Sequence, residues 1–336
     1  MTFDAESAGA ARVAPVFFHE NEAAVSRPGG DSHALDGLLP PGGALAGRVF
    51  SRLLGDMHDD PPLPPGTRVG AWRIGGLLGC GGCAVVYLAD RADGHFDQQA
   101  ALKVVRPRRE LIKQFRRERQ ILANLRHPAI ARLIDGGEIE GGQLWFAMEP
   151  VFGERIDDYV RSRELPLDER LALFESVCEA VAYAHRRQLV HRDIKPANVL
   201  VDEMGKPRLL DFGIATADDE RDEGDRAMTP SYASPEQCSG GVVTFASDIY
   251  QLGAILALLV ANGTPMRRRT ARKIDAIVAK AMATDPSARY GRVAELWSDV
   301  VAMREGRELS FVPPRRHGMW LAPSRVMRIA ATALGY

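Results

Sequence analysis

Three polar residues in the middle of the sequence have the types and order that phosphate chemistry requires. Asp193 and Asn198 belong to the stretch His191-Arg-Asp-Ile-Lys-Pro-Ala-Asn, and Asp211 follows thirteen positions later at the start of Asp-Phe-Gly. One carboxylate can accept a proton, while an amide and a second carboxylate can ligate a metal ion. In-line phosphoryl transfer needs a positioned hydroxyl and neutralised phosphate oxygens, which this set supplies.

A glycine-rich stretch upstream has the composition of a loop that covers phosphates. It runs from Leu78 to Tyr87 as Leu-Gly-Cys-Gly-Gly-Cys-Ala-Val-Val-Tyr. The β-branched and aromatic residues after the glycines predict a strand, so the loop joins two strands. A dinucleotide-binding loop would open a helix instead, and a nicotinamide-type site is therefore disfavoured. The residues expected nearest the phosphates are Leu78, Gly79, Gly81 and Gly82.

These motifs together resemble the bacterial eukaryotic-like (Hanks-type) Ser/Thr protein kinases, over about residues 72–301. Ala100–Val105 predicts a strand, and the resemblance implies that its Lys103 holds the α- and β-phosphates of ATP. Residues 111–125 show helical periodicity. Glu118 on this helix matches the glutamate that orients the lysine, although an ordinary exposed helix charge is the alternative.

The resemblance also implies roles for the central loop. Asp193 would accept or orient the proton of the substrate hydroxyl, and Lys195 would neutralise the transferring phosphate. Asn198 and Asp211 would ligate Mg²⁺, with Mn²⁺ as the alternative ion. Lysine at position 195 is typical of the Ser/Thr branch, and His191 is expected to be a packed structural histidine.

Adenine would lie between the two lobes of such a kinase. The resemblance places Val86 and Ala101 above the ring and Leu200 below it, with Met148 as gatekeeper. The hinge that offers backbone hydrogen bonds would run from Glu149 to Val151.

A second group of motifs resembles the end of the activation segment, in the stretch from Thr229 to Glu236. The resemblance implies that Glu236 pairs with Arg289 and that Asp248, at the start of a buried helix, holds the catalytic loop through hydrogen bonds. Small-molecule phosphotransferases of similar fold lack this segment, and they are the third-ranked interpretation.

The expected fold is α+β: a two-lobed protein-kinase-like fold with an antiparallel β-sheet N-lobe carrying one long helix and a mainly α-helical C-lobe. The expected N-lobe covers residues 67–148 and the C-lobe residues 149–312. Residues 1–66 read as a Pro/Gly-rich, largely disordered extension without a secretory signal pattern. Residues 313–336 are expected to form a basic tail, in which no apolar stretch is long enough to span a bilayer.

The composition agrees with this interpretation. The chain has 336 residues, of which 46% are hydrophobic, and a net charge of −1, so neither a nucleic-acid nor a membrane partner is expected. Four scattered cysteines suit a reducing cytoplasm. The pair Cys80 and Cys83 allows a redox couple or half of a zinc site, but small residues in a flexible hairpin are the simpler reading.

Three departures from the kinase pattern stand out. Ala84 replaces a customary glycine, which costs some backbone freedom. The stretch between Leu259 and Ile274 is much shorter than usual, so the helix that commonly docks substrates is expected to be reduced or absent. Six of the nine residues from Asp218 to Arg226 are acidic. They either replace an activating phosphate opposite Arg192 or form a solvated acidic loop.

We therefore expect a Mg²⁺- and ATP-dependent Ser/Thr protein kinase that acts on proteins, itself included. The alternative is a kinase-fold regulator or scaffold with vestigial catalysis, which the shortened stretch favours and the complete set of site residues disfavours.

Overall fold

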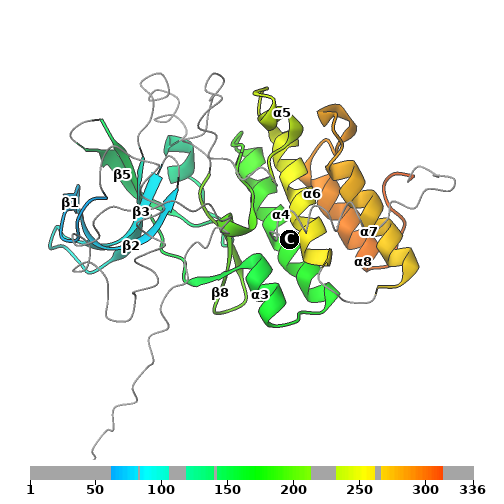
Figure 1. Cartoon of the computed structure of the whole chain (residues 1–336), viewed down its shortest axis with the longest axis horizontal. Coiled ribbons are helices and arrows are strands. Elements are labelled where there is room, and N and C mark those ends of the chain that lie inside the picture. The colour runs from blue at the N-terminus through cyan, green and yellow to red at the C-terminus, as the bar shows by residue number, and fades with distance from the viewer. Residues whose placement is uncertain are drawn as a thin grey trace, which may run out of the picture.

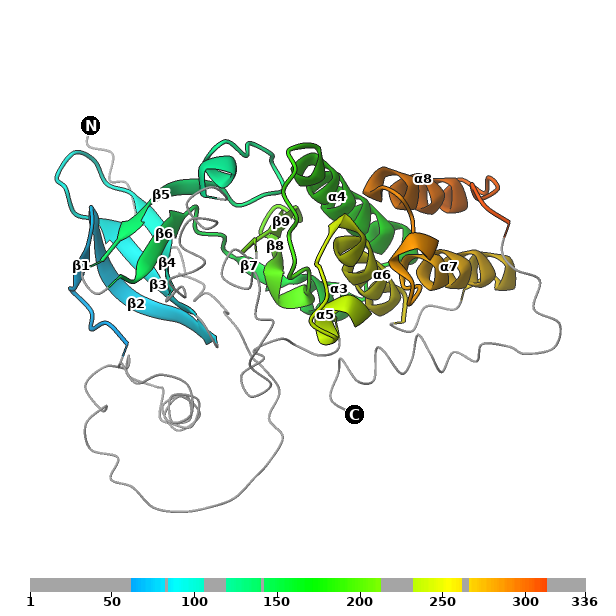
Figure 2. The same ribbon diagram turned by 90° about the horizontal axis from the view of Figure 1, so that it is seen from above.

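The computed structural model describes residues 62–81, 84–105, 119–139, 142–212, 232–261 and 266–312. These residues form a sheet-rich N-terminal part and a helical C-terminal part that lie side by side (Figure 1). Seen from above, a small second sheet lies at the junction between the two parts (Figure 2). The expected α+β architecture is confirmed, while the boundaries at residues 67, 148 and 312 stay predictions.

The large sheet has six antiparallel strands in the order β1-β2-β3-β4-β6-β5. Successive side chains of a strand point to opposite faces, so each strand presents alternate residues to the core of the sheet. The strands are β1 (Arg68–Val69), β2 (Trp72–Gly81), β3 (Ala84–Arg91), β4 (Gln99–Val105), β5 (Leu133–Glu138) and β6 (Leu144–Met148).

One face of this sheet is packed into its own core because the sheet curls. The indole Nε1 of Trp72 in β2 donates to Asp135 in β5 at 3.2 Å, although these strands are not neighbours in the sheet. Alternate residues of β4, namely Ala100, Leu102 and Val104, are buried in this core. Their neighbours in β4 therefore face the other way, toward the helical part.

The helical part is built around one apolar helix, α6 (Phe245–Ala261), which contacts α4 on one side and α7 on the other. A helix that is hydrophobic all round belongs inside a core, and thirteen of the residues of α6 are buried. The other helices are α3 (Ile156–Ser162), α4 (Leu167–Arg186), α5 (Pro235–Cys238), α7 (Arg268–Ala281) and α8 (Val293–Arg304). The small sheet consists of β7 (Gly153–Arg155), β8 (Val199–Asp202) and β9 (Pro207–Leu209), and single 3₁₀ turns lie at η2 (Pro196–Asn198) and η4 (Pro286–Ala288).

Two expectations about helices meet different outcomes. Residues 119–123 are helical, in line with the helix predicted over 111–125, but residues 111–118 lie outside the described residues. Only six residues separate the end of α6 from the start of α7, too few for a helix of ordinary length. Four of these six residues lie outside the described residues, so the expected loss or reduction of a helix between Leu259 and Ile274 stays a prediction. None of the helices in the described part combines the length and apolarity that crossing a bilayer requires.

Gly70, in the turn between β1 and β2, provides a test of the sheet core. Its φ is +59°, and an added Cβ would lie 2.5 Å from the ring of Trp145. We expect Gly70→Ala to lower the free energy of unfolding by about 2–4 kcal/mol, because left-handed backbone strain and overpacking add.

Gly66→Ala is the matched control, because φ at Gly66 is +88° and an added Cβ would meet nothing within 4 Å. It should lose only the strain term, about 1–2 kcal/mol. Urea unfolding of the two variants measures both values. Equal losses would show that the contact with Trp145 has no weight.

Candidate active site

The loop His191–Asn198 follows α4, and its backbone is hydrogen-bonded to a buried carboxylate of α6. Asp248 is fully buried and accepts the backbone N–H groups of His191 and Arg192, both at 2.8 Å. His185, at the end of α4, lies 2.7 Å from the same carboxylate through its Nε2. These bonds offset the cost of burying a charge. The predicted role of Asp248 in holding this loop is confirmed.

Two glutamines that the sequence analysis did not single out complete this support. Gln251 Oε1 accepts the N–H of Ile194 at 2.8 Å, and its Nε2 donates to the carbonyl oxygen of Arg192 at 2.9 Å. Gln237 donates to the same carbonyl oxygen at 2.8 Å. The carbonyl can be oriented this way because Arg192 has a left-handed φ of +72°. The available signal for Gln251 was a polar residue directly before the apolar run of α6 that starts at Leu252.

His191 is buried, and its hydrogen bonds define its tautomer. Its Nε2 lies 2.8 Å from the carbonyl oxygen of Leu210, so this nitrogen carries the proton and donates. Its Nδ1 accepts the N–H of Asp193 at 3.3 Å. Burial lowers the pKa of His191. The ring is therefore neutral and structural, as expected, and it packs against Phe212 at 4.6 Å between ring centroids.

Asp193, Lys195 and Asn198 converge at the open edge of this loop. Asn198 is buried, and its Nδ2 donates to Asp193 Oδ2 at 2.9 Å and to the Asp193 carbonyl oxygen at 2.7 Å. Lys195 Nζ lies 3.3 Å from the same Oδ2. Asp193 Oδ1 accepts no hydrogen bond from the described residues, and the side chain is 36% exposed. One oxygen is thus fixed, while the other has no hydrogen-bond partner among the described residues.

Lys103 reaches the site from the large sheet. In β4 it points away from the sheet core and pairs in register with Val86 of β3 and Phe146 of β6. Its Nζ lies 3.2 Å from Asp211 Oδ1, with both side chains less than a fifth exposed. Asp211 adopts a left-handed φ of +45°, directly before Phe212 enters the core. Residues 108 positions apart are thereby joined in an ion pair across the two parts of the molecule.

The residues expected to ligate a metal fit a divalent cation held jointly with phosphates. Asp211 Oδ1 is buried and accepts no hydrogen bond from the described residues, its ionic contact being with Lys103. The amide nitrogen of Asn198 donates to Asp193, and these hydrogen bonds fix the orientation of the amide. The amide oxygen of Asn198 therefore remains as the ligand atom. No cluster of three or more His, Cys, Asp or Glu among the described residues forms a metal cage. One or two side chains completed by phosphate oxygens is the usual arrangement for Mg²⁺.

The residues expected around adenine line the same side of the sheet as Lys103. Ala101 pairs with Met148 in register, and Val86 pairs with Lys103, so all four share that face. Leu200 lies in β8, buried at the junction of the two parts.

The segment Glu149–Val151, between β6 and β7, has backbone groups that could form hydrogen bonds with a heterocycle. The N–H of Glu149 donates to the Arg132 carbonyl oxygen at 2.8 Å. Among the described residues, the Glu149 carbonyl oxygen and the N–H of Val151 have no partner. The glutamate side chain pairs with Arg208 at 2.7 Å.

The glycine loop is described only in part. Gly79 pairs with Val86 and Gly81 with Ala84, so the loop does join two strands, and the register shifts between Leu77 and Gly79, at Leu78. Gly82, Cys83 and Glu118 lie outside the described residues, as do Thr229 and the acidic residues 218–225. Burial raises the pKa of Cys80, which disfavours the thiolate that oxidation or metal binding would need.

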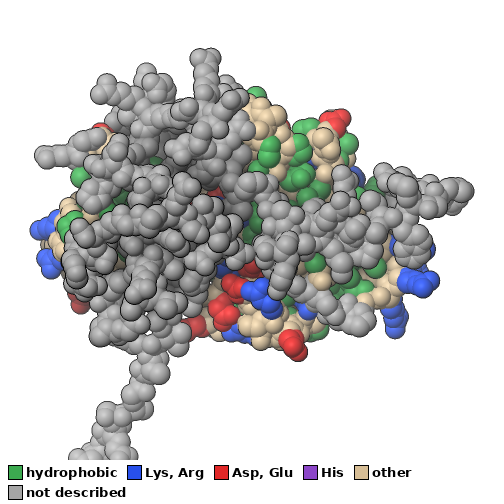
Figure 3. All heavy atoms as spheres, in the orientation of Figure 1, with side chains coloured by type: hydrophobic (Ala, Val, Ile, Leu, Met, Phe, Trp, Pro, Cys, Tyr) green, Lys and Arg blue, Asp and Glu red, His purple; other side chains and the backbone are tan. Residues whose placement is uncertain are grey.

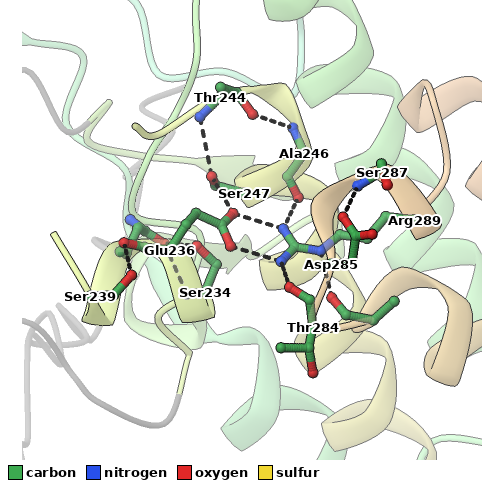
Figure 4. Close-up of polar contacts among 12 residues, drawn as sticks. Ser234, Glu236, Ser239, Thr244, Ala246, Ser247, Thr284, Asp285, Ser287 and Arg289 are labelled. Carbon is green, nitrogen blue, oxygen red and sulfur yellow. Dashed lines mark hydrogen bonds and ion pairs between the residues drawn. The ribbon is translucent and has the colours of Figure 1, made fainter. Parts of the chain in front are cut away.

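The predicted pair between Glu236 and Arg289 is confirmed, and Figure 4 shows how it joins three segments. Two guanidinium nitrogens of Arg289 donate to the two oxygens of Glu236, each at 2.7 Å. Arg289 also donates to the carbonyl oxygens of Ala246 and Ala283. Ser247 donates to Glu236 at 2.7 Å. Burial acts to raise the pKa of Glu236, but the bonds from Arg289 and Ser247 outweigh it and lower this pKa to about 2.

Comparison with known proteins agrees with this geometry. Residues 72–303 match the family described as protein kinase domain. The serine/threonine-protein kinase PrkC of Bacillus subtilis is 34% identical over 267 residues, covering 70% of this chain and 41% of PrkC. PknB of Mycolicibacterium smegmatis is 32% identical over 277 residues, covering 70% and 43%. A probable serine/threonine-protein kinase of Streptomyces coelicolor is 33% identical over 281 residues, covering 71% and 40%.

The chain therefore belongs to the protein kinase family, among the bacterial eukaryotic-like Ser/Thr kinases. It spans less than half the length of these relatives.

The lowered pKa of Glu236 predicts how stability depends on pH. A carboxylate with a depressed folded pKa stabilises the fold above its ordinary pKa of 4.5, and this contribution disappears as the pH falls toward 2. At pH 6 we expect Glu236→Gln to lower the free energy of unfolding by about 3–5 kcal/mol, because it leaves the buried Arg289 without a charged partner. The difference between wild type and variant should shrink as the pH is lowered from 5 to 3.

Glu154→Gln is the control, because Glu154 pairs with Arg163 at an exposed site where both side chains are at least 40% exposed. Its loss should stay below about 1 kcal/mol. Urea unfolding at several pH values measures both variants. A pH-independent difference for Glu236→Gln would contradict the assigned pKa.

Proposed function

We propose that this chain is a Ser/Thr protein kinase that transfers the γ-phosphoryl group of ATP to protein hydroxyls with the help of Mg²⁺. The observation that carries the proposal is the 3.2 Å ion pair between Lys103 and Asp211, which joins the phosphate-binding lysine of the sheet to the metal-binding aspartate beside the catalytic loop. Family membership supports the same activity, although the relatives are longer proteins.

Each residue of the site has a role that its contacts support. Asp193 is held through Oδ2 and is 36% exposed, with Oδ1 unbonded among the described residues, which suits a group that orients and accepts the proton of a substrate hydroxyl. Lys195, beside Asp193, would bind the transferring phosphate, and Lys103 the α- and β-phosphates. Asn198 and Asp211 would hold the cation, which bridges phosphate oxygens and neutralises their charge.

The nucleotide base would bind at the edge of the linking segment. Val86, Ala101 and Leu200 supply apolar surfaces, and the Glu149 carbonyl oxygen and Val151 N–H supply hydrogen bonds. Met148 would limit the depth of this site. Leu78, Gly79, Gly81 and Gly82 would cover the phosphates, and Glu118 would orient Lys103.

The finer features of the activity follow from the same site. We take Mg²⁺ as the cation, with Mn²⁺ as the alternative, and proteins, this chain included, as substrates. Lys195 favours Ser and Thr over Tyr. The cytoplasm is the compartment that supplies ATP and keeps thiols such as the buried Cys178 reduced.

A second function is favoured by one observation. Only six residues separate α6 from α7, too few for a separate helix of the kind with which kinases dock substrates. This short connection suits a regulator or scaffold with weak catalysis. The intact group formed by Lys103, Asp193, Asn198 and Asp211 favours the enzyme.

Incubation of the purified full chain with labelled ATP and Mg²⁺ tests the enzyme, with a Ser/Thr peptide as acceptor. We expect Lys103→Met and Asp193→Asn each to lower phosphate transfer by at least about 100-fold, because each removes a group that acts on the transferring phosphate or on its acceptor. Lys206→Met, an exposed lysine in the β8–β9 turn, is the control and should retain full activity.

Binding of a fluorescent ATP analogue separates the two functions. A wild-type chain that binds the analogue but transfers no phosphate would be a regulator. Phosphate transfer that survives both substitutions would come from a contaminating enzyme and would overturn the assignment of this site.

A further inference from the structure

Two buried glutamines of the helical part contact the backbone of the loop that contains Asp193. Gln251 in α6 is 2% exposed, and Gln237 in α5 is 9% exposed. Charged side chains of this part lie at its surface, such as the Lys and Arg at the right-hand end of Figure 3. A buried amide costs free energy unless it forms hydrogen bonds, and Leu or Met would fill the same space without that cost. A buried amide therefore indicates a geometric task, which its partners identify.

The amide of Gln251 is bonded to both peptide groups that flank Asp193. Its Nε2 donates at 2.9 Å to the carbonyl oxygen of Arg192, in the peptide group before Asp193. Its Oε1 accepts at 2.8 Å from the N–H of Ile194, in the peptide group after Asp193. Because each peptide group is planar, fixing both of them fixes the two backbone torsions of the residue between them. One side chain thus sets the backbone conformation of Asp193.

Gln237 supports the same carbonyl group and orients Gln251. Its Nε2 donates to the carbonyl oxygen of Arg192 at 2.8 Å, and its Oε1 accepts from Gln251 Nε2 at 3.0 Å. The N–H of Ser234 donates to the same Oε1 at 3.0 Å. A backbone N–H can only donate and a carbonyl oxygen can only accept, so these backbone partners fix the orientation of both amides. We call Gln251 and Gln237 together the amide clamp.

The backbone that the amide clamp holds is strained. Arg192 has a φ of +72°, a left-handed conformation that residues with a Cβ rarely adopt. Such a conformation persists only where several surrounding contacts impose it. Asp248 accepts the N–H of Arg192, and the amide clamp donates twice to its carbonyl oxygen. Without these two donors, relaxation of φ toward the right-handed region would turn the peptide group that leads to Asp193.

The other contacts of Asp193 come from its own loop. Asn198 donates to Oδ2 and to the carbonyl oxygen of Asp193, and Lys195 Nζ lies 3.3 Å from Oδ2. These partners belong to the same loop, so they move with Asp193 when the loop moves. The amide clamp belongs to α5 and α6, and it reaches past Asp193 to Ile194. It therefore fixes Asp193 relative to the helical core.

We propose that Gln251, oriented by Gln237, is a positioning residue for Asp193 in phosphoryl transfer. The inference rests on the proposed function, in which Asp193 orients the acceptor hydroxyl, and it adds a residue that touches no reacting group. A displacement of a reacting group by about 1 Å can lower a rate about 100-fold. Binding of ATP should be unaffected, because Lys103 and Asp211 are positioned by other contacts.

The test is steady-state phosphate transfer by Gln251→Met, which keeps the length of the side chain and removes both hydrogen bonds to the loop. We expect kcat per nucleotide-binding site to fall at least about tenfold, while KM for ATP and the affinity for a fluorescent ATP analogue stay within about twofold. Gln237→Met should lower kcat less, because the N–H of Ile194 keeps its partner. Counting sites by the bound analogue removes unfolded protein from the comparison.

Arg170→Met is the matched control. Arg170 is also buried, and it also donates to backbone groups, namely the carbonyl oxygens of Leu165 and of Leu259 at the far end of α6. This variant should lose stability but keep the wild-type kcat per site. An equal loss of kcat in Gln251→Met and Arg170→Met, an unchanged kcat in Gln251→Met, or a matching rise in KM for ATP would each overturn the proposal.

Hydrogen exchange in residues 189–199, followed by mass spectrometry, is a second readout that needs no turnover. We expect Gln251→Met to speed exchange in this peptide at least about tenfold, and Arg170→Met to leave it unchanged. If the wild type transfers no phosphate but this difference is present, the proposed function fails while the amide clamp stands. Equal exchange in the two variants would show that the amide clamp does not hold the loop.

Discussion

The position of the loop His191–Asn198 depends on one buried charge. Asp248 is completely removed from solvent, and a lone carboxylate there would cost several kcal/mol. Three donors from two other segments, the N–H groups of His191 and Arg192 and the ring of His185, compensate it. Since these donors satisfy the carboxylate only in one geometry, the loop between α4 and β8 is held at a fixed place above α6.

The same principle extends outward through a continuous set of polar contacts. The carbonyl oxygen of Arg192 accepts from Gln251 and Gln237, and Gln237 in turn accepts from Ser234. Glu236, directly before Gln237, forms an ion pair with Arg289. Helix α5 is therefore tied to the loop His191–Asn198 both directly, through Gln237, and through Gln251 of α6. A displacement of α5 relative to the loop would break these hydrogen bonds.

What could be predicted from the sequence differs between elements for physical reasons. Strand β4 was predicted from its own residues, whose alternate side chains are buried, whereas α6 is hydrophobic all round and followed from the family resemblance. The pair of Glu236 and Arg289 followed from a family resemblance, not from spacing. Gln237 and Gln251 were missed because their partner, the Arg192 carbonyl oxygen, belongs to the backbone, which has no signature in the sequence. Family sequence motifs specify residue types, and they carry no information about which backbone carbonyl groups accept hydrogen bonds.

Lys103 and Asp211 show how the two parts of the molecule share one site. The lysine is fixed by the register of β4 between β3 and β6, whereas the aspartate is fixed by the buried Phe212 that follows it. No local rule relates these two constraints, so their 3.2 Å contact reports how the sheet lies against the helical part. A triphosphate with its cation offers the lysine an anion and the aspartate a cation. The charges of Lys103 and Asp211 are therefore compensated both when they pair with each other and when they pair with phosphate and cation. Passing from one arrangement to the other leaves no buried charge unpaired.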